Sequence, residues 1–131
     1  VTSSKMTRFN ISIEEATLFV MKCLNNMIGG EIFIPKLQSY KITDLIKALG
    51  KNKFKIIGVR PGEKIHEELI TSQEKIRTFE KKDYFVIKPF LENSKFKKSK
   101  SLNSYDSYNN PDYLSISQLR KKIEIFKKKK S

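Results

Sequence analysis

The chain contains few of the residues that form disulfides, metal centres or redox sites. Its 131 residues include one cysteine, Cys23, one histidine, His66, and no tryptophan. One cysteine excludes an internal disulfide, and one cysteine with one histidine excludes a Cys/His zinc site within a single chain. Cys23 falls on the apolar stripe of an expected helix, where we expect a buried, unreactive thiol.

Long apolar runs and glycine-rich loops are also missing. The apolar runs are too short to span a membrane and the first residues carry no signal-peptide core, so we expect a cytoplasmic protein. The first residue is valine, and we expect the true start to lie upstream. No G-x-G-x-x-G phosphate loop occurs. Tyr84 and Lys88 match Tyr-x-x-x-Lys, but the stretch between them is typical of a strand, and we interpret it as hairpin core.

The charge of the chain is strongly one-sided. Lysine and arginine number 27 against 14 acidic residues, a formal charge of +13. This imbalance raises nucleic-acid binding as a hypothesis. Only four of the basic residues are arginine, the residue that best forms forked contacts to phosphates and base edges. A general bias toward lysine, isoleucine and asparagine explains much of the charge without any partner, so nucleic acid stays a minor alternative.

Hydrophobic periodicity predicts an α/β fold. Ser12 and Glu15 match a capping box, which predicts a helix over 12–28 that stops at Gly29-Gly30. The other expected elements are strands at 7–11, 31–35 and 54–59, a helix capped by Thr43 and closed by Gly50, a short helix after Pro61, a hairpin of 76–79 and 84–87, a polar loop over 91–110 anchored by Tyr105 and Tyr108, and a helix from Ser115 or Ser117. The expected strands are few and short. We therefore expect the sheet of this chain to form part of a larger structure.

The segment from Gly58 to Glu67 carries the first candidate site. Arg60 ends an expected buried strand beside the N-terminus of the expected short helix, where a guanidinium and free N–H groups favour phosphate. An ion pair of Arg60 with Glu63 or Glu67 is an equal alternative. Glu63 is able to accept hydrogen bonds from ribose hydroxyls. Its alternative role is a first-turn glutamate favoured by the helix dipole.

Two further residues extend this candidate site. His66 is the only histidine of the chain, but no nucleophile stands nearby, so we expect at most a minor ligand contact. Arg8 is a second strand-end arginine, with a surface salt bridge as its alternative role. Two such arginines in one small α/β unit favour a diphosphate, because that ligand requires more than one positive contact.

Several segments, in this order, carry a family resemblance. They are Met6-Thr7-Arg8-Phe9, Gly30 to Lys36, Thr43-Asp44-Leu45 and Arg60 to Glu67, with a tail of Tyr105 to Asn110 and Tyr113-Leu114. The chain resembles the C-terminal part of bacterial UDP-N-acetylglucosamine 4,6-dehydratases of polysaccharide biosynthesis, some of them also 5-epimerases, in the extended short-chain dehydrogenase/reductase superfamily. The tail resembles capsule-type members, and Arg60 to Glu67 is the most specific part.

The resemblance implies roles for matching residues. Arg8 and Arg60 would contact the diphosphate of UDP and Glu63 the uridine ribose, with His66 and Asn109 nearby. Nothing in the chain matches the family's catalytic tyrosine and lysine or its NADP-binding turn, which lie in a preceding Rossmann half.

The resemblance also implies an organisation for the chain. Residues 1–90 would form a nucleotide-sugar-binding α/β lobe, and residues 91–131 a polar crossover and a C-terminal helix packed on the same lobe. Asn10 departs from the family pattern, since many relatives have an aromatic residue there.

The leading hypothesis is a UDP-sugar-binding region that is not catalytic alone. The resemblance implies no cofactor on this chain, NADP in the complete enzyme, a Rossmann half on the same or a separate chain, and a homo-oligomer when intact. In that enzyme NADP would take a hydride from C4 of the sugar, water would leave across C5 and C6, and the hydride would return at C6. A non-enzymatic interaction module and a basic nucleic-acid-binding protein are the alternatives.

Overall fold

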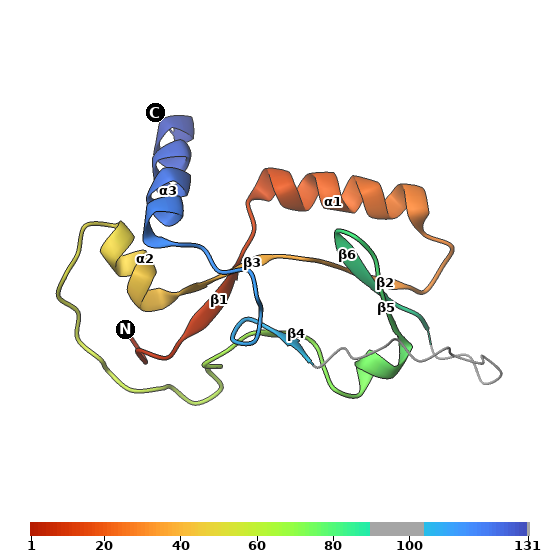
Figure 1. Cartoon of the computed structure of the whole chain (residues 1–131), viewed down its shortest axis with the longest axis horizontal. Helices are drawn as coiled ribbons and strands as arrows, with labels where there is room; N and C mark the ends of the chain where they lie inside the picture. The colour runs from red at the N-terminus through yellow and green to blue at the C-terminus, as the bar shows by residue number, and fades with distance from the viewer. Residues whose placement is uncertain (90–103, 131) are drawn as a thin grey trace. The chain divides into compact units, whose positions relative to one another are not determined.

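The computed structural model describes residues 1–89 and 104–130, which form a mixed α/β protein (Figure 1). The helices among them are α1 (Ile13–Asn26), α2 (Ile42–Ala48), α3 (Ile116–Lys130) and the short 3-10 helix η1 (Glu74–Arg77). The strands are β1 (Thr7–Asn10), β2 (Ile32–Pro35), β3 (Gln38–Lys41), β4 (Glu68–Ile70), β5 (Thr78–Glu80), β6 (Tyr84–Ile87) and β7 (Tyr105–Asp106). The chain divides into two compact units, each built from separate stretches.

Unit 1 contains Val1–Asn10, Gln38–Glu67 and the stretch from Ser107 onward. Strands β1 and β3 pair antiparallel, with Thr7 opposite Lys41. Helices α2 and α3 pack through a small core of Ala48, Leu114 and Leu119, ringed by partly buried Tyr40, Leu45, Ile116 and Ile123. Ile116, Leu119 and Ile123 of the last helix thus pack in this core, whereas Phe126 near its end is 59% exposed.

Unit 2 contains Ile11–Leu37 and the described residues from Glu68 to Asp106. Its main sheet is antiparallel, in the order β2-β6-β5, and β4 pairs separately with β7. The central strand β6 supplies buried Phe85, Val86 and Ile87. Phe19 of α1 packs edge-on against Tyr84, with ring centroids 6.1 Å apart. The hydroxyl of buried Tyr105 accepts the Leu37 N–H at 2.7 Å, which confirms this tyrosine as an anchor.

Local sequence signals predicted several elements correctly. The Ser12–Glu15 capping box is present and starts α1, although the helix ends at Asn26, before the two glycines. The strand at 31–35 and the 84–87 arm of the hairpin match β2 and β6. Tyr84 lies in a strand, which confirms that Tyr-x-x-x-Lys here is sheet core and not a helical pair.

The predicted buried strand at 54–59 is wrong. Residues 51–60 have no regular structure, and Phe54, Ile56, Ile57 and Val59 are exposed. Within residues 54–59, the Ile57 N–H donates to Val1 O at 2.9 Å, and Lys55 O accepts the Val1 ammonium at 2.8 Å. Without a flanking strand among the described residues, the β-prone sequence has no ladder to join.

One strand was not predicted, and two smaller expectations are wrong. Residues 38–41 form β3, a strand that the sequence pattern did not indicate. Helix α2 starts at Ile42, capped by Lys41 without a side-chain hydrogen bond, so Thr43 is not its cap. Cys23 is only partly buried, although burial still raises the pKa of its thiol and Lys22 opposes that rise.

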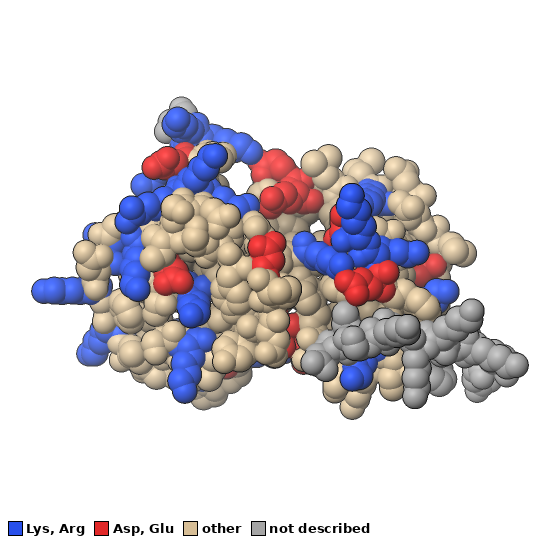
Figure 2. All heavy atoms as spheres, viewed as in Figure 1, with Lys and Arg blue, Asp and Glu red and all other residues tan. Residues whose placement is uncertain are grey.

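Lysine and arginine side chains are spread over the visible face, most of which other residues form (Figure 2). They gather around the end of α3, whose sequence finishes in four consecutive lysines. None of the helices in residues 1–89 and 104–130 combines the length and apolar character needed to cross a membrane.

Candidate functional site

The motif from Arg60 to Glu63 is a tight turn. The Glu63 N–H donates to Arg60 O at 3.0 Å, and Gly62 has a φ of 79°. Proline second and a positive-φ glycine third are the signature of a type II turn. The short helix predicted after Pro61 is therefore wrong, because Gly62 adopts a left-handed conformation that a helix excludes. The expected helix N-terminus is absent from this site, and a turn followed by β4 replaces it.

The Glu63 carboxylate closes this turn. It accepts the Arg60 N–H at 3.2 Å and the Thr2 hydroxyl at 2.9 Å. The Arg60 N–H, then the Thr2 hydroxyl, then the nearby guanidiniums of Arg60 and Arg8 hold the pKa of Glu63 below its ordinary value. Glu63 is thus an anion at neutral pH with a fixed orientation.

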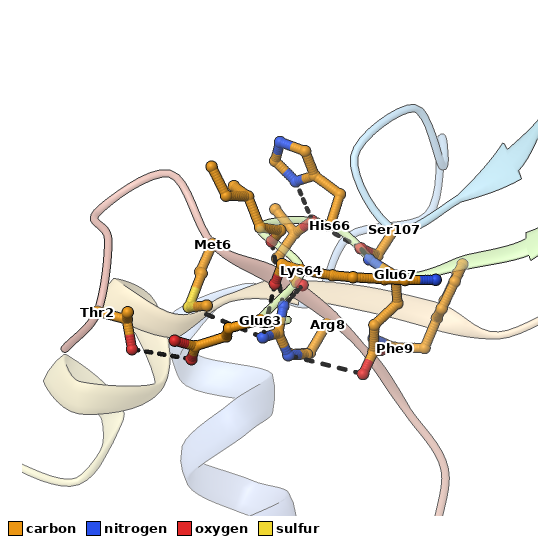
Figure 3. A network of polar contacts seen from close by, with 11 residues as sticks. Thr2, Met6, Arg8, Phe9, Glu63, Lys64, His66, Glu67 and Ser107 are labelled. Carbon is orange, nitrogen blue, oxygen red and sulfur yellow. Dashed lines mark hydrogen bonds and ion pairs between the residues drawn. The ribbon is translucent and has the colours of Figure 1, made fainter. Parts of the chain in front are cut away.

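Arg8 fixes the backbone just after the turn (Figure 3). Its Nη1 donates to Thr7 O at 2.7 Å and to Ile65 O at 3.1 Å, and its Nη2 donates to Lys64 O at 3.0 Å. Its Nε lies 3.6 Å from the Glu67 carboxylate, so the salt-bridge alternative for Arg8 is confirmed. The side chain is 21% exposed.

Glu67 joins the motif to the rest of unit 1. Its carboxylate accepts the Phe9 N–H at 2.9 Å, in the place where a neighbouring strand would offer a carbonyl. Its own N–H donates to Ser107 Oγ at 2.9 Å, and its carbonyl accepts the Ser107 N–H at 2.7 Å. The end of the motif is held from both sides.

His66 belongs to a polar network behind the turn. Its Nδ1 lies 2.8 Å from the Thr7 hydroxyl, which lies 2.7 Å from that of Ser107. Thr7 and Ser107 are 1% and 0% exposed, so their bonds are shielded from water. The imidazole also stacks on Tyr108, with ring centroids 4.7 Å apart. This network holds Nδ1 within the protein.

Arg60 is placed differently from Arg8. It is exposed, and among the described residues no carboxylate pairs with its guanidinium. The ion pairs expected as its alternative are not found, since Glu67 pairs with Arg8 and Glu63 binds the Arg60 backbone. The guanidinium therefore stands at a hydrogen-bonded turn and is accessible to an external anion.

All the predicted site residues lie in unit 1. Asn109 is exposed in the turn after Ser107, and its neighbour Asn110 is buried and donates to Ser39 Oγ at 2.9 Å. Sequence reasoning missed the hydroxyl groups of Thr2, Thr7 and Ser107. Their spacing carries no signal, because each meets the motif from a distant part of the chain. Among the described residues no cluster of three histidine, cysteine or carboxylate side chains is available for a metal.

The fold and site define an α/β region that presents one accessible arginine on a braced turn. A family model described as "Polysaccharide biosynthesis protein" matches residues 1–89, and the chain belongs to this family. The chain is 42% identical to a Campylobacter jejuni protein named UDP-N-acetylglucosamine 4,6-dehydratase (inverting), over 91% of this chain and 40% of that protein.

Two further relatives support this membership. A Rickettsia canadensis protein named UDP-glucose 4-epimerase is 32% identical over 83% of the chain and 36% of its own length. The X-ray structure of Pen from Bacillus thuringiensis superposes with a TM-score of 0.76 and 32% identity, over 96% of this chain and 39% of that one. The chain thus spans about two fifths of the length of the relatives it matches.

Proposed function

We propose that this chain is the UDP-sugar-binding lobe of a nucleotide-sugar 4,6-dehydratase or epimerase of the extended short-chain dehydrogenase/reductase superfamily, and that it is not catalytic alone. The observation that carries the proposal is the accessible Arg60 guanidinium, held on a turn whose position Glu63 and Arg8 fix. A cation that is already held in position loses less conformational entropy when it binds a diphosphate. The similarity to a protein named as a UDP-N-acetylglucosamine dehydratase supports the identity of the ligand.

The residues divide this work between them. Arg60 is the primary contact to a diphosphate, because its donors are accessible. Arg8 adds positive potential while it shapes the backbone that presents the ligand. Glu63 offers acceptor lone pairs to a ribose hydroxyl in addition to the bonds it already accepts. His66 and Asn109 complete the rim, in secondary roles.

A nicotinamide cofactor does not fit the residues of this chain. When bound in the complete enzyme, such a cofactor would accept and return the hydride. A dinucleotide requires a glycine-rich turn between a strand and a helix of a parallel sheet. The sequence has no such turn, and every named pair of described strands is antiparallel. We therefore expect NADP on a Rossmann portion, in the same or a separate chain, and we expect the intact enzyme to be a homo-oligomer.

Calorimetric titration of the 131-residue chain with UDP tests the proposal. We expect Arg60→Ala to weaken binding by about tenfold or more, the value of one charge-assisted contact. Arg120→Ala is the matched control, since it removes the same charge from an exposed site on α3. Equal losses of UDP affinity in both variants would show that the effect comes from the net charge of the chain and not from Arg60 itself.

Two other results would contradict the proposal. Conversion of the sugar nucleotide by the chain alone would show that it is catalytic without a partner. Tight nucleic-acid binding with a steep salt dependence, unchanged by Arg60→Ala and accompanied by no UDP binding, would favour the nucleic-acid alternative.

A further inference from the structure

The C-terminal half of helix α3 carries charge and apolar surface that the core of unit 1 does not use. Ile116, Leu119 and Ile123 pack in that core, and the helix then continues for about two turns beyond it. Figure 1 shows this end of α3 extending past α2. In these turns Ile125 is 49% exposed and Phe126 is 59% exposed.

Ile125 lies on the side of α3 that faces away from the core. Successive residues of an α-helix are about 100° apart around the helix axis. Ile125 is therefore about 120° from Leu119, about 160° from Ile123 and about 180° from Ile116. Packing of α2 on α3 does not require an apolar residue at this position.

Four lysines surround Ile125. Their positions are three and four residues before it and three and four residues after it, the spacings at which helical side chains are neighbours: Lys121, Lys122, Lys128 and Lys129. Lys121, Lys128 and Lys129 are exposed, and Lys122 is partly buried. We call Ile125 and these four lysines the α3 lysine face.

The helix dipole accounts for only part of this charge. Cations stabilise a helix near its C-terminus, and the effect falls off within the last turn. It therefore covers Lys128 and Lys129 but not Lys121 and Lys122, which lie more than one turn before the end. Glu124 is the one acidic residue in the sequence of α3, so positive charge is in large excess. An excess of this kind on one face attracts an extended anionic surface.

The central isoleucine favours a lipid surface over a nucleic acid. Phosphates and base edges are bound best by arginine forks, and bases by flat aromatic rings, and neither contact requires an isoleucine among lysines. The headgroup region of a bilayer accommodates both parts, because anionic lipids attract the ammonium groups and the acyl boundary accepts Ile125. Lysine stems lie along apolar surface while their charges stay at the headgroups.

We propose that the α3 lysine face binds the surface of an anionic phospholipid bilayer, with α3 lying along the headgroups. Ile125 and the adjoining Phe126 bury little apolar area, so charge supplies most of the attraction and added salt should weaken it. The inference does not rest on the proposed function, since the residues proposed to bind UDP lie on other segments of unit 1.

Sedimentation of the 131-residue chain with lipid vesicles tests the proposal. The vesicles contain either phosphatidylcholine alone or phosphatidylcholine with about one third phosphatidylglycerol. We expect the chain to bind the anionic vesicles about tenfold or more tightly than the neutral ones, and sodium chloride to remove most of this difference. Equal binding to both kinds of vesicle, or binding to neither, would overturn the proposal.

Ile125→Asp and Ile76→Asp provide the first matched comparison. Both isoleucines are exposed, both changes alter the net charge equally, and Ile76 belongs to η1 of unit 2. We expect Ile125→Asp to weaken binding to anionic vesicles about tenfold, and Ile76→Asp to change it by no more than about twofold. Circular dichroism checks that each variant keeps its helix content. Equal effects on vesicle binding would overturn the proposal.

A second comparison leaves the apolar residues unchanged. The double variant Lys121→Gln/Lys128→Gln removes two charges from the α3 lysine face, and Lys51→Gln/Lys53→Gln removes two from the exposed stretch after α2. The first should weaken binding to anionic vesicles about tenfold, and the second no more than about twofold. Equal losses would assign the binding to net charge and would overturn the proposal.

A mixed-sequence RNA and UDP complete the test. If RNA binds the chain, Lys121→Gln/Lys128→Gln weakens that binding and vesicles do not bind, the lysine face belongs to a nucleic-acid site and the proposal is overturned. The variants of α3 should bind UDP as the unmodified chain does. A chain that binds anionic vesicles but not UDP would contradict the proposed function and leave the lipid-binding proposal standing.

Discussion

The hydroxyl oxygens of Thr7 and Ser107 lie 2.7 Å apart, although 100 positions separate the two residues. One hydroxyl also meets His66, and the other accepts the Glu67 N–H. Two buried hydroxyls thus join the first strand, the motif and the tail. The shape of the Arg60–Glu67 segment depends on both.

Removal of one of these hydroxyls should destabilise the protein and weaken UDP binding together. Ser107→Ala leaves the buried Thr7 hydroxyl and the Glu67 N–H without this acceptor, at a cost of about 1–3 kcal/mol in the free energy of unfolding. Urea unfolding and UDP titration measure the two effects. Ser117→Ala, at an exposed position of α3, is the control and should change neither. A stable Ser107→Ala variant would show that the network contributes nothing.

Arg8 and Arg60 should respond differently to substitution. Arg8→Lys replaces a forked donor that binds three carbonyls with one ammonium, and should lower the free energy of unfolding by about 1–3 kcal/mol. Arg60→Lys should leave stability within about 0.5 kcal/mol, because the side chain has no described partner to lose. Thermal and urea unfolding distinguish the two. Equal stabilities would contradict the bracing role of Arg8.

Glu63 should make stability depend on acidity. Its pKa is lowered in the folded state, so its contribution is complete above the pKa of the unfolded glutamate and is lost as the pH falls through the folded value. The stability difference between the unmodified chain and Glu63→Gln should therefore shrink between about pH 5 and pH 3. Urea unfolding at a series of pH values measures it, with Glu124→Gln on α3 as the exposed control. A constant difference would exclude Glu63 as the titrating group.

The exposed stretch around Ile56 should tolerate truncation. Ile70 is completely buried, and Ile70→Ala should cost about 2–5 kcal/mol. Ile56 is 55% exposed, and the same change there should cost no more than about 0.5 kcal/mol in this chain. A large loss of unfolding free energy in Ile56→Ala would indicate that this stretch is buried, as the sequence predicts.

Sequence signals succeeded where the cause is local. The capping box before α1 and the apolar run of β6 act within a few residues, and both elements formed as expected. The 54–59 stretch shows the opposite case, since a strand requires a partner that periodicity does not name. The sequence predicts a short helix after Pro61, but Gly62 selects a turn in place of a helix start.

The candidate site was predictable only in part. Arginine, glutamate and histidine in one short segment indicated binding chemistry, and the family resemblance gave that chemistry a ligand. The bracing contacts were not predictable, because they come from residues 2, 7 and 107, and no spacing rule joins these to the motif. Arg8 and Arg60 have different roles because Arg8 is largely buried and Arg60 is exposed, a difference that the sequence alone does not give.

The tie between Glu67 and Ser107 also has a consequence for the order of assembly. A peptide of Arg60 to Glu67 contains every residue of the turn, yet lacks the partners that hold it in shape, so the motif should not function when transplanted. During synthesis the turn is made well before Ser107 leaves the ribosome. Because contacts over such separations close late in folding, the binding site should mature only after the C-terminal part of unit 1 has docked.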